Sequence, residues 1–183
     1  MILKDQAFCP ACGARLQERP LEGEGMVPYC VGCQDYRFPK FNVAVSMIVR
    51  DERTGKILLI QQYGRPFYIL VAGYVNRGEA AEHAAIREIR EETGMTVSRL
   101  SFNRTRFFEP SNTLMVNFTA FVSDAAAIRP NQEVDRYAWF TPEEARKNIK
   151  PGSLAEAFLN ACLEEPPSQP GGLEKKDSME YGG

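Results

Sequence analysis

The apolar residues of this chain gather in short runs separated by polar and turn-forming residues. Two β-rich runs, FNVAVSMIV at 41–49 and KILLIQQ at 56–62, flank the sequence DERTG, which is typical of a hairpin turn. A third short strand is predicted at 67–71. Further extended segments are predicted at 96–108, 113–122 and 133–140. Together these runs indicate a curved mixed sheet.

Helical periodicity appears in residues 79–93, between a loop that begins at Gly73 and a stop at Gly94. Gly94 can take the positive φ that ends a helix, and Gly73 allows a tight loop before the helix. Ile86 and Ile89 lie on the opposite side of the helical wheel from the glutamates that follow them. We expect both isoleucines to be buried against the sheet.

Two short helices are predicted after the last strand. Thr141 is a capping residue with proline at the next position and glutamate at the third, and residues 153–156 offer a second capping box. An apolar stripe at helical spacing is expected to face the core, at Leu154, Ala157, Phe158 and Ala161. Strands on both sides of one helix, with further helices behind them, indicate an α/β fold.

Length and charge narrow the possibilities. At 183 residues and 20.6 kDa, the chain can form one well-packed domain and a small module. The formal net charge of −2 and the pI near 5.6 provide no basic surface for non-specific nucleic-acid binding. No apolar run approaches the roughly 20 residues of a membrane-spanning helix, and no signal peptide is evident. We therefore expect a cytoplasmic protein without a membrane partner.

Four of the five cysteines form two C-x-x-C pairs. Cys9 and Cys12 form the first pair, and Cys30 and Cys33 form the second, with seventeen residues between the two pairs. This spacing is that of a four-thiolate zinc ribbon. Zn²⁺ would supply the folding free energy that a segment of about 35 residues with little core lacks. Disulfides or a redox pair are the alternatives, which two matched pairs without a secretory signal disfavour.

Composition then divides the chain into three regions. Residues 1–38 form the predicted zinc ribbon, and residues 39–163 form the main domain. Residues 164–183 are rich in proline, glycine and charge and have little to bury, so we expect a disordered tail. Cys162 is interpreted as a small buried apolar group, and His83 as a solvated or packed residue turned away from the glutamates.

Three carboxylates share one face of the predicted central helix. At about 100° per residue, Glu91 and Glu92 lie on either side of Glu88. Like charges at such spacings destabilise a helix, so the cluster would benefit from a cation. Oxygen ligands without histidine or cysteine suit Mg²⁺ or Mn²⁺, which bind carboxylates together with substrate phosphates. A solvated, charged helix surface is the alternative interpretation, whereas a metal site would indicate phosphate chemistry.

The spacing of residues 73–95 resembles the signature of the Nudix hydrolases. The nine positions of that signature are Gly73, Glu79, Arg87, Glu88, Ile89, Glu91, Glu92, Gly94 and Met95, and each has the residue type that the signature requires. The resemblance implies a Nudix-type α/β/α sandwich with a curved mixed sheet, joined to the small N-terminal zinc ribbon.

The glutamates would hold the catalytic cation for metal-assisted attack of water on a pyrophosphate. The expected ligands are Glu88, Glu91, Glu92 and, by resemblance, Glu133, which lies six residues before Trp139. Arg87 is expected to fix a glutamate by a bidentate contact. The family varies in which glutamate is the general base, so Glu88 and Glu91 both remain candidates. Glu79 is a metal or substrate-side group, and the backbone carbonyl of Ala72 or Gly73 completes the expected coordination.

The ribbon that runs into the first strand, and the sequence Ala72-Gly73-Tyr74-Val75, are similar to the NADH pyrophosphatase branch, which also removes NAD caps from RNA. That branch has a Ser-Gln-Pro-Trp-Pro-Phe-Pro array after the box, whereas residues 105–111 read TRFFEPS. Phe107 and Phe108 in this stretch could stack on a nucleotide base, or they could be aromatic residues of the sheet core.

The leading hypothesis is hydrolysis of a nucleoside diphosphate linked to another moiety, such as NADH, ADP-ribose or a related dinucleotide. Hydrolysis of nucleoside triphosphates or of NAD-capped RNA is the second hypothesis, and RNA would be a partner only as a capped substrate. A non-catalytic nucleotide or ADP-ribose sensor is the third, which the intact box disfavours. The family resemblance also implies a homodimer.

Overall fold

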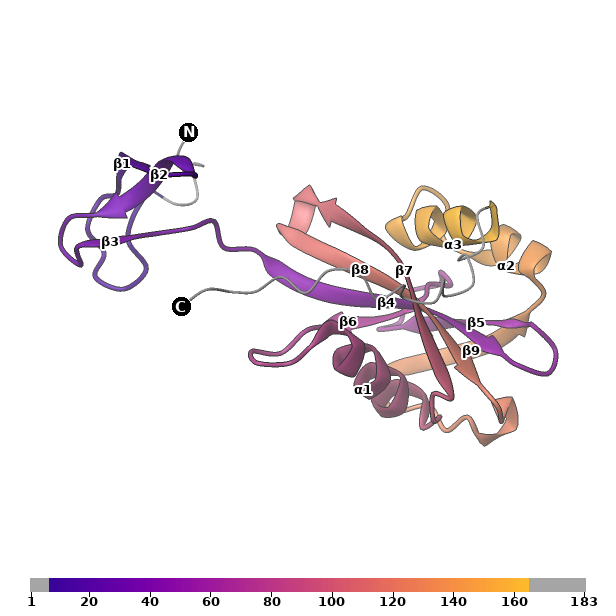
Figure 1. Cartoon of the computed structure of the whole chain (residues 1–183). Helices are drawn as coiled ribbons and strands as arrows, with labels where there is room; N and C mark the ends of the chain where they lie inside the picture. Colours follow the sequence, from indigo (N-terminus) through magenta and orange to yellow (C-terminus); the bar gives the residue numbers. More distant parts are fainter. Residues whose placement is uncertain (1–6, 165–183) are drawn as a thin grey trace, which may run out of the picture. The chain divides into compact units, whose positions relative to one another are not determined.

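The computed structural model of the protein describes residues 7–164, which fall into two compact units that divide between Phe41 and Asn42 (Figure 1). The predicted tail lies outside the described residues except for Glu164, the last residue of the final helix. Within the described residues, no helix is long and apolar enough to cross a membrane. The domain boundary expected after residue 38 stays a prediction.

The N-terminal unit is a three-stranded antiparallel sheet in the order β1-β2-β3. Its strands are β1 (Gln17–Leu21), β2 (Gly25–Cys30) and β3 (Asp35–Tyr36). Its buried cluster consists of Cys9, Leu16 and Cys30, with Ala14 and Cys33 packed against it. So small a core provides little hydrophobic stabilisation, as expected for a zinc ribbon.

The second unit is built on a six-stranded mixed sheet. Its strands are β4 (Asn42–Asp51), β5 (Ile57–Gln62), β6 (Val71–Tyr74), β7 (Arg99–Phe108), β8 (Thr113–Val122) and β9 (Val134–Phe140). The order is β7-β8-β4-β5-β9, and β6 also pairs with β4. Only β4 and β8 are parallel. One side of β4 pairs with β6 over residues 44–47 and with β5 at Arg50, so two strands share that side.

Helices cover both faces of this sheet (Figure 1). Helix α1 (Ala81–Thr93) covers one face, and α2 (Pro142–Asn148) and α3 (Leu154–Glu164) cover the other. Because successive side chains of a strand point to opposite faces, β5 contributes to two cores. Leu58 and Ile60 pack in the α1 core, whereas Ile57 and Leu59 pack in the α2/α3 core. The predicted α/β/α sandwich with a mixed sheet is confirmed.

Helix α1 differs from its prediction at two points. It begins at Ala81, so Glu79 lies in the preceding loop instead of the first turn. The prediction that Ile86 is buried is wrong, because Ile86 is 41% exposed, whereas Ile89 is fully buried. The buried face consists of Ala84, Ala85, Ile89, Glu92 and Thr93. Two small alanines, in place of a second isoleucine, lie between the helix and the sheet.

The strand predicted at residues 67–71 is wrong, since β6 begins only at Val71. The preceding residues form isolated bridges, from Ile69 to Ile60 and from Tyr68 to Ile149. Their side chains alternate between the two cores: Ile69 packs on the α1 side, while Tyr68 and Leu70 pack on the α2/α3 side. The run is apolar because both its faces are covered, although it makes no regular ladder. The segment predicted from residue 96 likewise becomes a strand only at Arg99.

The two C-terminal helices begin at their predicted caps. Thr141 and Glu144 form a complete capping box. At α3 the hydroxyl of Ser153 accepts from the N–H of Glu156 at 3.1 Å, but the Glu156 carboxylate accepts from Gly152 at 2.7 Å. The buried positions of α3 are Phe158, Leu159 and Cys162. Only Phe158 of the predicted stripe is therefore fully buried, and the expected burial of Cys162 is confirmed.

The β4–β5 hairpin depends on Asp51, whose carboxylate is buried in the turn. It accepts from the Thr54 hydroxyl at 2.6 Å and from the Arg53 N–H at 3.1 Å. The Thr54 bond, although opposed by burial, holds the pKa of Asp51 below its usual value. A carboxyl pKa that is lower in the folded state stabilises the fold above the unfolded-state pKa, which is about 4. That stabilisation is lost as the pH falls through the folded-state pKa.

We expect Asp51→Asn to lower the free energy of unfolding at pH 7 and to lower it much less near pH 3. Urea denaturation of both proteins at the two pH values measures the difference. Glu52→Gln, which changes the neighbouring exposed acid, is the control and should show neither effect. An equal loss of unfolding free energy for Asp51→Asn at both pH values would contradict the stabilising role of the ionised Asp51 carboxylate.

Candidate active site

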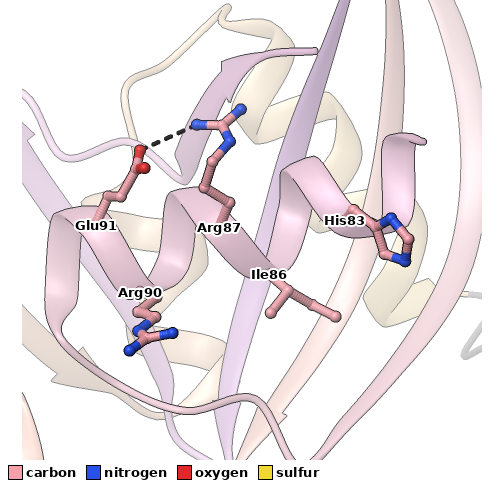
Figure 2. A pocket seen from close by; sticks show the side chains of 5 residues that line it. All are labelled: His83, Ile86, Arg87, Arg90 and Glu91. Atoms are coloured by element: carbon pink, nitrogen blue, oxygen red, sulfur yellow. Dashed lines mark hydrogen bonds and ion pairs between the residues drawn. The ribbon is translucent and has the colours of Figure 1, made fainter. Parts of the chain in front are cut away.

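The guanidinium of Arg87 on α1 donates hydrogen bonds to three carboxylates of the predicted box. Its Nε and Nη2 donate to the two oxygens of Glu79 at 2.8 and 3.0 Å, which is the expected bidentate contact. Its Nη1 donates to Glu88 at 2.8 Å and to Glu91 at 3.0 Å, the latter drawn in Figure 2. A further Nη2 bond of 3.0 Å reaches the carbonyl of Tyr74. These bonds match the five N–H donors of an arginine.

Glu79, in the loop before α1, accepts two of the Arg87 hydrogen bonds. Its carboxylate also accepts the backbone N–H of Asn76 at 2.9 Å. The Arg87 bonds, followed by the Asn76 bond, lower the pKa of Glu79 to about 2. The carboxylate is therefore ionised at neutral pH and orients the guanidinium. Its predicted contact with metal or substrate stays a prediction.

Glu88 is seated against the backbone of Gly73. A Cβ built on Gly73 would overlap the carboxyl group of Glu88, so a larger residue at this position would displace that carboxyl group. The predicted reason for Gly73, a tight loop, is wrong. Gly73 lies within β6 opposite Val45, and the loop takes its positive φ of 81° at Gly78. Burial, opposed by Arg87, raises the pKa of Glu88.

The remaining box carboxylates differ in exposure. Glu91 is exposed, whereas Glu92 is only 4% exposed, and its Oε2 has no hydrogen-bond partner. Burial raises the pKa of Glu92 to about 7, against the effect of the neighbouring Gln62 amide. The charges of Glu88, Glu133 and Glu91 raise it further. The other three predicted acidic ligands therefore lie close enough to Glu92 for their charges to act on it.

A loop from far along the chain brings Glu133 to this neighbourhood. The backbone N–H groups of Arg129 and Asn131 donate to the carbonyls of Thr93 and Glu92 at 2.7 and 3.0 Å. These bonds satisfy helix-end carbonyls that would otherwise lack partners. Two features of the structure favour glycine at position 94. Its φ is 70°, in the left-handed region, and a Cβ added here would lie only 3.1 Å from the Cβ of Arg129.

Sequence reasoning missed two residues beside the acids. The hydroxyl of Tyr63 donates to Oε2 of Glu133 at 2.8 Å. This bond, then burial, then the charges of Glu133, Glu92 and Glu88 raise the pKa of Tyr63. Gln62 is 7% exposed, and its Nε2 has no hydrogen-bond partner. A polar side chain at the end of the apolar β5 run was the available signal for Gln62.

The predicted stacking residues do not join this cluster in a common pocket. Phe108 lines a hollow of about 300 Å³ with Arg106 and the start of α3, and none of the box carboxylates lines it. Phe107 is on the opposite face of β7 by the alternation of the strand. A contact of either ring with substrate stays a prediction, as does coordination by the carbonyl of Ala72 or Gly73.

The outer surface of α1 carries a separate open hollow of about 570 Å³. It is lined by His83, Ile86, Arg87, Arg90 and Glu91 (Figure 2). His83 is exposed, as expected for a solvated residue. Only Arg87 and Glu91 belong to both this hollow and the carboxylate network.

The four cysteines of the N-terminal unit converge on one point. Their sulfur atoms all lie within 4.8 Å of one another, and no other group of three or more His, Cys, Asp or Glu residues does so in residues 7–164. Cys12 Sγ lies 3.4 Å from Cys30 Sγ, and Cys9 Sγ lies 3.9 Å from Cys33 Sγ. This cluster could hold a metal ion. Left-handed residues follow the second cysteine of each pair, with φ of 74° at Gly13 and 56° at Gln34.

A basic side chain borders the cysteine cluster. Arg37 Nε donates to Cys9 Sγ at 3.3 Å. Burial alone would raise the pKa of the Cys9 thiol, but the Arg37 bond and backbone N–H groups outweigh it and bring the pKa to about 5. Neighbouring sulfurs raise the pKa of Cys33. A bound cation would stabilise all four sulfur atoms as thiolates.

Comparison with known proteins agrees with this geometry. Residues 40–158 match the NUDIX domain family, a span that includes the whole six-stranded sheet, α1 and the network around Arg87. The chain belongs to the NUDIX domain family.

Curated relatives of the chain include proteins named NAD-capped RNA hydrolase NudC. The protein of Vibrio vulnificus (strain CMCP6) is 29% identical over 162 residues, which cover 85% of this chain and 59% of the relative. That of Pseudomonas aeruginosa (strain LESB58) is 29% identical over 158 residues, which cover 85% of this chain and 55% of the relative. The chain therefore spans less than two thirds of the length of either relative.

Solved structures share the fold. A NUDIX hydrolase from Nitrosomonas europaea has a TM-score of 0.60 and 23% identity, over 87% of this chain and 91% of that one. The NUDIX domain of Shewanella oneidensis NrtR, solved with ADP ribose, has a TM-score of 0.58 and 16% identity, over 74% and 92%. At these identities the likeness concerns the fold.

The contact of Glu88 with Gly73 predicts a strongly non-additive pair of substitutions. Gly73→Ala should lower the free energy of unfolding by about 1 kcal/mol, because the new methyl group displaces the partly buried Glu88 carboxyl from its bond with Arg87. In a Glu88→Ala background the same change should cost much less, because the obstructing group is absent. Urea denaturation of the four proteins measures both costs.

The control for this pair is Gly32→Ala, where an added Cβ meets its nearest neighbour at an ordinary 3.6 Å. It should give the same small cost with and without Glu88. Equal costs of Gly73→Ala in the two backgrounds would show that Glu88 is not the obstruction.

Proposed function

We propose that this protein hydrolyses the pyrophosphate bond of a nucleoside diphosphate linked to another moiety, such as NADH, ADP-ribose or a related dinucleotide. The observation that carries the proposal is the gathering of carboxylates at the end of α1, where a buried oxygen of Glu92 has no hydrogen-bond partner. A buried, unpartnered carboxylate oxygen is costly unless a ligand satisfies it.

The donor set of this site fits a hard divalent cation. We propose Mg²⁺ or Mn²⁺ as the cation and Glu88, Glu91, Glu92 and Glu133 as the ligands, because all four donors are carboxylates and the neighbouring charges raise the pKa of Glu88 and Glu92. Such a cation, when bound, neutralises charge on the pyrophosphate and activates water.

The protein's own residues then have separable roles. Arg87 fixes the positions of Glu88 and Glu91, and Glu79 orients Arg87 from the other side. Glu88 and Glu91 are the two candidates for the general base. Glu88 is held firmly by Arg87 and partly buried, and burial raises its pKa, which favours proton acceptance, whereas Glu91 is open to solvent and to a bulky substrate.

A second candidate function is hydrolysis of NAD-capped RNA, which the names of the curated relatives favour. Both candidates break the same kind of bond, so the box supports them equally. They differ in the size of the group beyond the pyrophosphate. The third hypothesis is a nucleotide sensor, which would bind ADP-ribose without hydrolysing it.

We expect purified protein with Mg²⁺ or Mn²⁺ to hydrolyse NADH, NAD⁺ or ADP-ribose, as measured by phosphatase-coupled phosphate release. Glu91→Gln and Glu92→Gln should each lower kcat by at least about 100-fold, because each loses a charged ligand or base. Glu82→Gln, on the exposed first turn of α1, is the control and should keep full activity.

Full activity of Glu92→Gln would remove the metal assignment. Binding of ADP-ribose without turnover of any substrate in the panel would identify a sensor instead. Selective release of NMN from NAD-capped RNA, with little cleavage of free NADH, would favour the second candidate.

We further propose that the cysteine cluster binds one Zn²⁺ through Cys9, Cys12, Cys30 and Cys33. Metal analysis of the purified chain should find about one zinc per chain. Cys30→Ser should lose the metal and the ordered ribbon, because the small core cannot replace it. Cys162→Ala, which changes the one cysteine outside the cluster, should retain full zinc content. Unchanged zinc in Cys30→Ser would contradict the ligand set.

A further inference from the structure

A small pocket lies where the chain leaves β5. Its volume is about 140 Å³, and its wall consists of Gln62, Tyr63, Arg65, Phe67, Ile69 and Lys150. We call it the Gln62 pocket. It shares no residue with the hollow on α1 or with the hollow beside Phe108.

Main-chain hydrogen bonds hold the two segments that form this pocket. Ile60 and Ile69 exchange bonds of 3.0 and 2.8 Å, which close the loop after β5. The N–H of Lys150 donates to the carbonyl of Tyr68 at 2.9 Å, which fixes the second residue after α2 against the loop. The pocket is therefore preformed, as binding sites usually are.

The Gln62 pocket adjoins the carboxylate cluster. Tyr63, on its rim, donates to Glu133 at 2.8 Å, and the N–H of Gly64 donates to Asp135 at 2.7 Å. β5 and β9 pair at Gln62 and Val134, next to Glu133. A substrate whose pyrophosphate lies at the carboxylates can therefore reach this pocket with an adjacent part.

The wall combines three kinds of ligand contact. Phe67 and Tyr63 expose aromatic rings, at 47% and 67% exposure. Arg65 and Lys150 bring two cations, and neither forms an ion pair with another described residue. Lys150 Nζ instead lies 5.4 Å from the centre of the Phe67 ring. Gln62 is more than nine-tenths buried, with an unpartnered Nε2 donor.

The size and the chemistry together select one part of a nucleotide. A cavity of 140 Å³ is smaller than the roughly 300–1,000 Å³ that hold a whole drug-sized ligand. It suits one planar heterocycle, which can stack on an aromatic ring and accept a hydrogen bond at a ring carbonyl or nitrogen. Cations at the rim suit the neighbouring phosphate.

We propose that the Gln62 pocket binds the heterocyclic base of the substrate, with Phe67 as the stacking surface and Gln62 as the specificity-determining donor. Arg65 and Lys150 bind the phosphate next to that base. This assignment rests on the proposed pyrophosphohydrolase function, because it places the scissile bond at Glu88, Glu92 and Glu133.

The test separates base binding from phosphate binding. Affinities for AMP, ribose 5-phosphate and inorganic phosphate are measured by calorimetry with the full chain. Phe67→Leu should weaken AMP binding at least tenfold, as expected for a lost stacking contact, and leave the other two affinities unchanged. Lys150→Gln should weaken all three. Gln62→Met, with thermal unfolding as a check on folding, should weaken AMP alone.

The matched control is Phe102→Leu, since Phe102 is a similarly exposed phenylalanine (57%) on β7, outside the pocket. It should leave all affinities unchanged. Equal AMP affinity in Phe67→Leu and Phe102→Leu would overturn the proposal, and so would the lack of saturable AMP binding by the unchanged chain.

Steady-state kinetics with the cleaved dinucleotide keep the two proposals distinguishable. Phe67→Leu should raise KM with little change in kcat, because the base is bound away from the reacting atoms. If turnover occurs and KM is unchanged in Phe67→Leu, the pocket assignment fails while the function stands. If AMP binds through Phe67 but no substrate is cleaved, the function fails while the pocket stands.

Discussion

Repulsion among carboxylates is the constraint on which the candidate site depends. Burial raises the pKa of Glu88 and Glu92 on α1, and the charges of Glu91 and Glu133 raise both further. Arg87 offsets part of this repulsion because its N–H groups donate to three glutamates and one backbone carbonyl. Gly73 contributes by lacking a side chain where the Glu88 carboxyl lies. The spacing of the box is therefore a packing requirement as well as a chemical one.

The site is assembled from segments far apart in the sequence. The residues at 129–131 cap the end of α1, Gly94 allows their close approach, and Glu133 follows them directly. The loop after β5 reaches the same place through the bond between Tyr63 and Glu133. Because both loops are fixed by main-chain bonds, the carboxylates and the Gln62 pocket are held in one preorganised arrangement, which suits a site for charged substrates.

The two units of the chain are stabilised in different ways. The sandwich buries apolar side chains on both faces of its sheet, with Leu58 and Ile60 on one side and Ile57 and Leu59 on the other. In the part of the chain that the structure describes, the buried cluster of the ribbon consists only of Cys9, Leu16 and Cys30. Hydrophobic burial alone therefore gives the ribbon little stability, and the convergence of four sulfur atoms provides a place where a metal ion could add to it.

The sequence alone determined the family signature, the cysteine pairs, most strands and the capped start of α2, because these depend on local spacing. Burial of Ile89 also followed from helical periodicity, but exposure of Ile86 did not, since the rotation of α1 depends on how Ala84 and Ala85 pack. The late start of β6 was decided by its pairing with β4, which no local pattern encodes. Only the tertiary structure showed that Gly73 lies against the Glu88 carboxyl and that Gln62 and Tyr63 lie beside the acids. These contacts join residues on different strands, helices and loops, so they form only in the folded chain.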